Sequence, residues 1–193
     1  MSDNKAALIV VDIQNDFCPG GALAADGGSA IVPAVNRHLA EARERGMPVY
    51  ATRDWHPAVT THFKQYGGEW PPHCVQESPG AQFHPDLRLP VDAIVINKGD
   101  DPAKDGYSAF DGHTQSGTPL LHDLRARNVT TLYIAGIATD YCVKTTALDA
   151  VQAGIDVRVL KDAITGIDVR PGDVRRALDE MTRAGAQIVE RVT

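Results

Sequence analysis

Short apolar runs that alternate with segments of helical periodicity constrain the fold of this chain most strongly. The first run, AALIVVD at residues 6–12, has the length and composition of a buried strand. A run that is apolar throughout indicates a strand covered on both faces, as in parallel sheets flanked by helices. The pattern predicts the α/β class, with a three-layer α/β/α sandwich and a mainly parallel six-stranded sheet. The strands are predicted at residues 6–12, 47–52, 93–97, 131–135, 156–160 and 187–190.

Helical segments fill the intervals between these runs. Residues 29–45 carry an apolar stripe, with Ser29 placed to cap the first turn and Gly46 to end the helix. Pro171 suits the first turn of the last helix, where an N–H has no helical partner. The 193 residues, 43% of them apolar, suffice for one core, so a single domain is predicted over residues 1–193. The remaining helices are predicted at residues 120–127, 140–153 and 171–184.

Charge and cysteine content argue against several classes of partner. The net charge of −6 and the lack of a basic stripe argue against nucleic acid, whose binding depends on clustered Lys and Arg. The apolar run ending at Asp12 is too short for a membrane span and has no signal-peptide pattern, so we expect no membrane partner and a cytoplasmic location. Three widely spaced cysteines do not form a disulfide pattern. We expect a monomer or small homo-oligomer that acts on a small molecule.

Two stretches interrupt the alternation of strands and helices. Residues 55–91 show no clear period and are rich in Pro, His and Gly, and residues 99–117 are irregular and carry several charges. Loops as long as the first are usually functional or disordered. The aromatic and histidine content of residues 55–91 favours a functional loop.

Polar residues at the ends of four predicted strands converge on one edge of the sheet. Asp12 ends the first strand, Asp54 follows the second and Lys98 follows the third. The fourth strand leads through GIATDYC to Cys142. Ligands bind outside the carboxyl ends of the strands in open α/β sheets. The convergence of these four side chains predicts a functional site at that edge.

Cys142 is the candidate nucleophile. It follows two possible helix caps, so its sulfur is expected in a first helical turn, where the helix dipole favours a thiolate. The alternative is a small buried hydrophobic residue, which a free cysteine often is. Asp12 and Lys98 could each be structural, but together with a cysteine they form a coherent set. The carboxylate can take the thiol proton, and the ammonium can lower the thiol and carboxyl pKa values.

Four side chains are candidate ligands for a metal ion: Asp54, His56, His62 and His73. Three imidazoles and a carboxylate suit Zn, Fe, Mn or Co, but not Ca or Mg. The alternative is a histidine-rich loop that is merely solvated. Phe17 and Trp70 could be core residues, or they could stack on an aromatic substrate.

Five segments together carry a family resemblance: VDIQNDF at residues 11–17, DWH at 54–56, WPPHC at 70–74, NKG at 97–99 and GIATDYC at 136–142. The chain resembles the nicotinamidase/pyrazinamidase family of isochorismatase-like hydrolases from residue 6 to about residue 190. The Asp, Lys and Cys set alone would indicate only the superfamily. The DxH, His62 and WPPHC series narrows the resemblance to nicotinamidases.

The resemblance implies an amidase that converts nicotinamide, and pyrazinamide as well, to the acid and ammonia through a cysteine thioester. In this reading Asp12, Lys98 and Cys142 form the catalytic triad. The backbone N–H groups of Ala138 and Cys142 form an oxyanion hole beside a cis peptide at Ile137–Ala138. The nicotinate product would feed NAD salvage.

The resemblance also implies a cofactor and a ring-binding site. One divalent transition-metal ion, which is zinc, iron or manganese in relatives, would face the pyridine nitrogen. Its ligands would be Asp54, His56, His62 and His73. The substrate would contact Phe17, Trp70, Tyr107 and Ala138.

Three other functions remain open from the sequence. An amidase of the same superfamily acting on a carbamoyl or ureido compound would keep the triad without needing the four metal ligands. A vinyl-ether hydrolase of the isochorismatase type should not need the cysteine. A non-catalytic nicotinamide or metal sensor would not need the whole triad. The variable residues 100–105, and Tyr141 beside the nucleophile, leave the preference among pyridine and pyrazine amides open.

Overall fold

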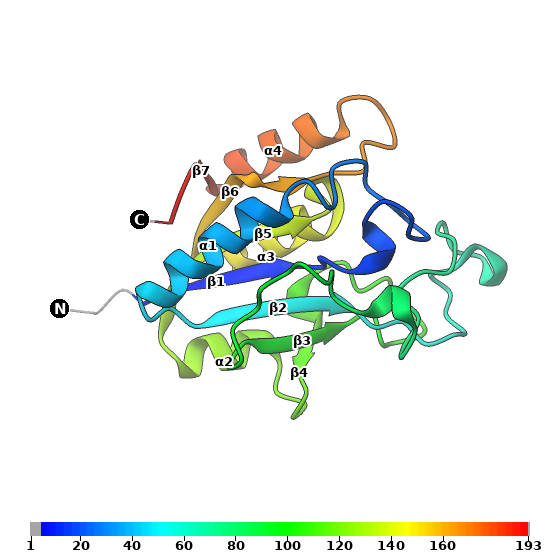
Figure 1. The fold of residues 1–193 in the computed structure, drawn as a ribbon, viewed down its shortest axis with the longest axis horizontal. Helices are drawn as coiled ribbons and strands as arrows, with labels where there is room; N and C mark the ends of the chain where they lie inside the picture. The colour runs from blue at the N-terminus through cyan, green and yellow to red at the C-terminus, as the bar shows by residue number, and fades with distance from the viewer. Residues whose placement is uncertain (1–4, 193) are drawn as a thin grey trace.

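A twisted seven-stranded sheet forms the centre of the computed structural model, which describes residues 5–192 (Figure 1). The strand order is β4-β3-β2-β1-β5-β6-β7. The α/β class and the mainly parallel sheet are confirmed, and the predicted domain of residues 1–193 extends at both ends beyond the described residues. The strands are β1 (Lys5–Val11), β2 (Val49–Asp54), β3 (Ile94–Lys98), β4 (His113–Thr114), β5 (Val129–Ile137), β6 (Asp156–Thr165) and β7 (Gln187–Val189).

The predicted number of six strands is wrong, because β4 adds a seventh within the described residues. This strand pairs antiparallel with β3, with His113 opposite Asn97. Two residues are too few to show the alternating pattern that marks a strand in a sequence. The other strand pairs are parallel, so their carboxyl ends meet at one edge.

The two faces of the sheet are covered by different helices. Leu8 and Val10 of β1 belong to the same core cluster as the apolar face of α1. Ala7 and Ile9 point to the other face and belong to the cluster that includes residues of α2, α3 and α4. This alternation explains why β1 is apolar throughout, and it confirms the three-layer sandwich (Figure 1). The helices are α1 (Val32–Glu44), α2 (Leu120–Ala126), α3 (Lys144–Gln152) and α4 (Asp173–Ala184).

Several predicted helix boundaries are wrong. The first helix begins at Val32, and Ser29 does not cap it; instead, its hydroxyl forms a hydrogen bond of 3.1 Å with His84 Nε2. The last helix begins at Asp173, two residues after the predicted start. The segment before α3 is a turn of π-helix, Thr139–Val143, in which Cys142 lies. None of the helices among residues 5–192 is long and apolar enough to span a membrane.

The irregular segment at residues 55–91 is ordered by contacts with the end of β2. His56 forms an isolated bridge with Val75. The side chain of Gln14 accepts a hydrogen bond from the Asp54 backbone N–H and donates to the carbonyls of Asp54 and Ala81. These contacts hold the long loop against the carboxyl edge of the sheet.

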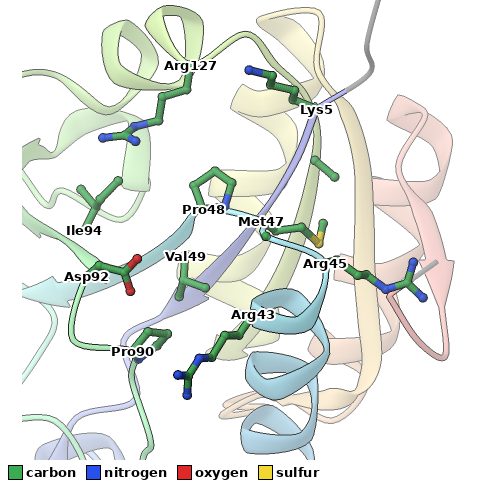
Figure 2. A pocket seen from close by; sticks show the side chains of 12 residues that line it. Lys5, Arg43, Arg45, Met47, Pro48, Val49, Pro90, Asp92, Ile94 and Arg127 are labelled. Atoms are coloured by element: carbon green, nitrogen blue, oxygen red, sulfur yellow. The ribbon is translucent and has the colours of Figure 1, made fainter.

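A broad, open depression lies at the opposite, amino-terminal edge of the sheet (Figure 2). Its basic groups belong to Lys5, Arg43, Arg45 and Arg127. The side chain of Arg43, in α1, and that of Arg45, just after this helix, point in different directions (Figure 2). Arg127 is engaged with Asp123 at 2.7 Å. The described residues that line this depression include none of the predicted site residues.

Candidate active site

The parallel strands bring the four predicted strand-end residues together. Asp12 follows β1, Asp54 ends β2, Lys98 ends β3, and Cys142 lies in the π-helical turn after β5. All four side chains are buried. The close approach of β5 to β1 requires a glycine at Gly136, because a Cβ there would lie 2.0 Å from a β1 carbonyl oxygen. The fold therefore assembles a buried polar cluster at the predicted edge.

Lys98 is the centre of this cluster. Its ammonium lies 2.8 Å from Asp12 Oδ2, 2.5 Å from Asp54 Oδ1 and 3.4 Å from Cys142 Sγ. Burial opposes its charge, but the neighbouring carboxylates outweigh burial and hold the pKa of Lys98 well above its ordinary value. The amine therefore stays protonated and contacts both acids and the thiol.

Asp12 can accept a proton near neutral pH. Burial raises its pKa to about 6, against the lowering effect of Lys98. The hydroxyl of Thr52 donates to Asp12 Oδ1 over 2.6 Å, which favours the ionised form. The backbone φ of Asp12 is 50°, an uncommon value for a residue with a side chain.

Burial opposes the thiolate that the helix dipole is expected to favour at Cys142. Burial raises the pKa of the thiol well above its ordinary value, and the charges of Asp12 and Asp54 raise it further. Lys98 lowers it, as expected, but by less. A sulfur enclosed by the sheet and its π-helical turn loses more hydration than one ammonium restores. The surroundings of Cys142 therefore favour the protonated thiol over the thiolate.

The three predicted histidine ligands gather beside this cluster. His56 and His62 stack with ring centroids 4.6 Å apart, and His73 meets them at 5.1 and 5.3 Å. Potential ligand atoms of the three residues lie within 4.8 Å of one another. Burial lowers the pKa of His73 to about 4 and also lowers that of His62. Both imidazoles therefore favour the neutral form that metal binding requires.

Each of these imidazoles uses Nδ1 for a hydrogen bond to an oxygen. His56 Nδ1 lies 2.8 Å from the Gly99 carbonyl, and His73 Nδ1 lies 2.8 Å from that of Pro71. Carbonyl oxygens only accept, so Nδ1 carries the hydrogen and Nε2 presents a lone pair. The buried Nε2 of His56 has no hydrogen-bond partner among the described residues. This donor set fits a transition-metal ion.

Asp54 connects the two clusters. Its Oδ1 contacts Lys98, and its Oδ2 lies 3.7 Å from His56 Nε2 and 4.0 Å from His73 Nε2. Burial alone would raise the pKa of Asp54, but the charge of Lys98 outweighs burial and holds this pKa below its ordinary value. Its carboxylate is thus ionised and faces the imidazoles, as a fourth ligand would.

A narrow pocket opens over both clusters. It is lined by the predicted ring-binding residues Phe17, Trp70, Tyr107 and Ala138 together with Asp54, His62, His73 and Cys142. The indole N–H of Trp70 donates to the Tyr107 hydroxyl over 2.8 Å. The peptide Ile137–Ala138 is cis, as the resemblance implied. Asp12, Lys98 and His56 do not line the pocket, but they belong to the two clusters whose other members do.

Three further residues line the pocket: Leu23, Tyr141 and Ile167. The sequence marked only Tyr141, as a variable neighbour of the nucleophile. Leu23 and Ile167 are isolated apolar residues in irregular segments, so no periodicity or motif distinguishes them. Asp140 brings Ile167 into place, because its carboxylate accepts hydrogen bonds from the backbone N–H groups of Ile167 and Asp168.

The family of the chain follows from comparison with known proteins. A family model described as the isochorismatase domain matches residues 6–191, so the chain belongs to the isochorismatase family. The nicotinamidase of Escherichia coli is 43% identical, with 94% of this chain and 93% of that protein covered. The nicotinamidase/pyrazinamidase of Mycobacterium tuberculosis is 45% identical, with 95% and 97% covered. Within its family, the chain belongs to the nicotinamidase/pyrazinamidase group of enzymes.

A solved structure supports the same relationship. The crystal structure of the pyrazinamidase of Pyrococcus horikoshii in complex with zinc superposes with a TM-score of 0.89 at 47% identity. The alignment covers 96% of this chain and 99% of that one. The fold and the family resemblance noted in the sequence are thereby confirmed.

Proposed function

We propose that this protein hydrolyses nicotinamide, and pyrazinamide as well, to the carboxylic acid and ammonia through a thioester on Cys142. The observation that carries the proposal is the position of Asp54, which contacts Lys98 on one side and faces the imidazoles on the other. One pocket thus offers a nucleophile for an amide and a metal site for a ring nitrogen. The identities of 43% and 45% to nicotinamidases support this substrate class.

The first half of the reaction is amide cleavage. Asp12 takes the proton of Cys142 as the sulfur attacks the carboxamide carbon, which avoids forming a free thiolate in a buried site. The backbone N–H groups of Ala138 and Cys142 stabilise the oxyanion, and one such donor typically lowers a barrier by about 3 kcal/mol. Asp12 then gives the proton to the departing nitrogen. Ammonia leaves, and the acyl group remains on sulfur.

The second half is hydrolysis of the thioester. Asp12 takes a proton from a water molecule, and the resulting hydroxyl attacks the acyl carbon. The carbon–sulfur bond breaks, and the sulfur regains its proton from Asp12. Lys98 contacts both Asp12 and Cys142, so it stabilises their ionised forms in both halves.

The metal site and the pocket walls select the substrate. A divalent transition-metal ion (Zn, Fe or Mn) held by Asp54, His56, His62 and His73 would bind and polarise the ring through its nitrogen. Phe17, Trp70 and Tyr107 would position the ring between them. The four ligands disfavour the ureido-amidase alternative, whose substrate presents no ring nitrogen to a metal.

Ammonia release from nicotinamide by the purified protein tests the proposal. The parent should release ammonia and Cys142→Ala should not, while Cys18→Ala, which alters another buried free cysteine, should behave like the parent. Mass spectrometry of the quenched reaction should detect the acyl group on Cys142. No release by parent protein shown to contain metal would overturn the assignment. Turnover of a carbamoyl compound instead would establish the ureido-amidase alternative, and nicotinamide binding without turnover would establish the sensor.

A further inference from the structure

The three histidines of the candidate metal site differ in the group that orients them. His56 and His73 donate from Nδ1 to backbone carbonyls, those of Gly99 and Pro71. His62 alone among the three uses Nδ1 to contact a side chain, because this atom lies 2.7 Å from Asp105 Oδ1. A carboxylate carries a full negative charge, so it fixes the tautomer and also increases the basicity of the opposite ring nitrogen.

Asp105 lies in a loop that is built around the candidate site. The Gly99 carbonyl of this loop orients His56, and a Cβ at Gly99 would lie 2.5 Å from that imidazole ring. The Gly106 carbonyl accepts from Lys98 over 3.2 Å. Tyr107, two residues after Asp105, packs edge-on against His62 with centroids 5.6 Å apart. The two residues after Asp105 thus contact Lys98 and His62, and the Asp105 side chain itself is 59% exposed.

We propose that Asp105 is a positioning residue that strengthens metal binding through His62. Its carboxylate holds the imidazole with Nε2 toward His56 and His73 and makes that nitrogen a stronger donor. This inference rests on the proposed metal site, and it assigns a role to the loop at residues 100–105. Outer partners of metal-bound histidines typically contribute about 10- to 100-fold in metal affinity.

The test is the affinity of the purified full-length protein for Zn²⁺, measured by competition with a chromophoric chelator. Asp105→Ala should weaken Zn²⁺ binding about 10- to 100-fold. Asp105→Asn, which keeps an acceptor without the charge, should lie between this variant and the parent. The Co²⁺-loaded parent should show a visible absorption band, and Asp105→Ala should change its intensity or position. These readouts do not depend on turnover.

Asp101→Ala is the matched control. Asp101 is a second acidic residue of the same loop, but its carboxylate accepts from the Ala103 N–H and pairs with Lys104. It should bind Zn²⁺ as tightly as the parent. Equal weakening in both variants would overturn the inference, because loop integrity rather than the contact with His62 would be responsible.

Two further outcomes separate the inference from the proposed function. Unchanged Zn²⁺ affinity in Asp105→Ala would overturn the inference and leave the amidase proposal intact. Absence of Zn²⁺ and Co²⁺ binding by the parent would overturn the metal site and the inference together.

Thermal melting of the metal-free proteins tests for a structural role. The melting temperatures of Asp105→Ala and Asp101→Ala should be close to that of the parent. A large fall in melting temperature confined to Asp105→Ala would indicate a structural role instead.

Discussion

Asp54 and Lys98 lie directly opposite each other at the ends of the neighbouring parallel strands β2 and β3. This register places the ammonium 2.5 Å from Asp54 Oδ1 and leaves Oδ2 facing His56 and His73. One salt bridge therefore joins the reacting groups to the candidate metal site. Changes on either side are expected to affect the other.

Replacing Lys98 by Met should destabilise the metal-free protein by about 3–5 kcal/mol at pH 7, because two buried carboxylates would lose their partner. Without the ammonium, the folded state should bind more protons than the unfolded state does. The loss should therefore shrink as the pH falls toward 5. Urea unfolding at both pH values measures it. Lys104→Met, at an exposed position, should change stability by no more than about 0.5 kcal/mol, and an equally small effect at Lys98 would contradict the buried-pair description.

The pH dependence of kcat/KM should show an acid limb set by Asp12. The pKa of this residue is raised by burial to about 6, and only the ionised form can take the thiol proton. Activity should therefore fall about tenfold per pH unit below 6. Thr52→Val removes a hydrogen bond that lowers the Asp12 pKa, so the limb should move to higher pH.

Thr131→Val is the control for Thr52→Val. Thr131 is a buried threonine of β5 near the amino-terminal edge of the sheet, away from Asp12, so its substitution should leave the acid limb in place. Rate measurements with nicotinamide between pH 4.5 and 8 compare the three proteins. A limb that stays in place in Thr52→Val would assign the titration to another group.

Metal removal should reduce activity and thermal stability together. The buried imidazoles place possible ligand atoms within 4.8 Å of one another. A bound ion should therefore stabilise the native state by about 2.7 kcal/mol at a concentration 100 times its Kd. Added Zn²⁺ should raise the melting temperature of the chelator-treated parent and of His84→Ala, but not of His56→Ala. His84 is a suitable control because it bonds Ser29 outside the cluster. An equal shift in all three proteins would place the ion elsewhere.

Tyr107→Phe should raise KM about 2- to 10-fold with little change in kcat. The substitution removes the hydroxyl that accepts from the Trp70 indole, and a hydrogen bond of this kind contributes about 0.5–1.5 kcal/mol. Loss of a wall that binds ground and transition states equally changes KM alone. Steady-state kinetics with nicotinamide measure both constants. Tyr66→Phe, at a tyrosine that is 43% exposed, should match the parent, and a fall in kcat alone for Tyr107→Phe would argue against a role in ring positioning.

The sequence was sufficient to locate the parallel strands and the polar residues near their carboxyl ends, although β6 extends to Thr165, five residues beyond its predicted end. Buried parallel strands are apolar throughout, so their positions are visible without knowledge of the fold. Because parallel strands end at the same edge, Asp12, Asp54, Lys98 and Cys142 could be placed together in advance. The two-residue strand β4 could not be predicted, since its pairing with β3 leaves no pattern in so short a segment.

Only the tertiary structure decided the state of these groups and the rest of the pocket. The thiol pKa of Cys142 depends on how much water the whole fold excludes, and burial outweighs Lys98. The contact of His62 with Asp105 joins residues that are 43 positions apart in two irregular loops. No repeating sequence pattern predicts a contact of this kind. Leu23 and Ile167 also line the pocket from irregular segments, so no sequence pattern could place them there. Local periodicity depends only on residues that are close in the sequence. Desolvation and contacts between loops arise only when the chain is folded and packed.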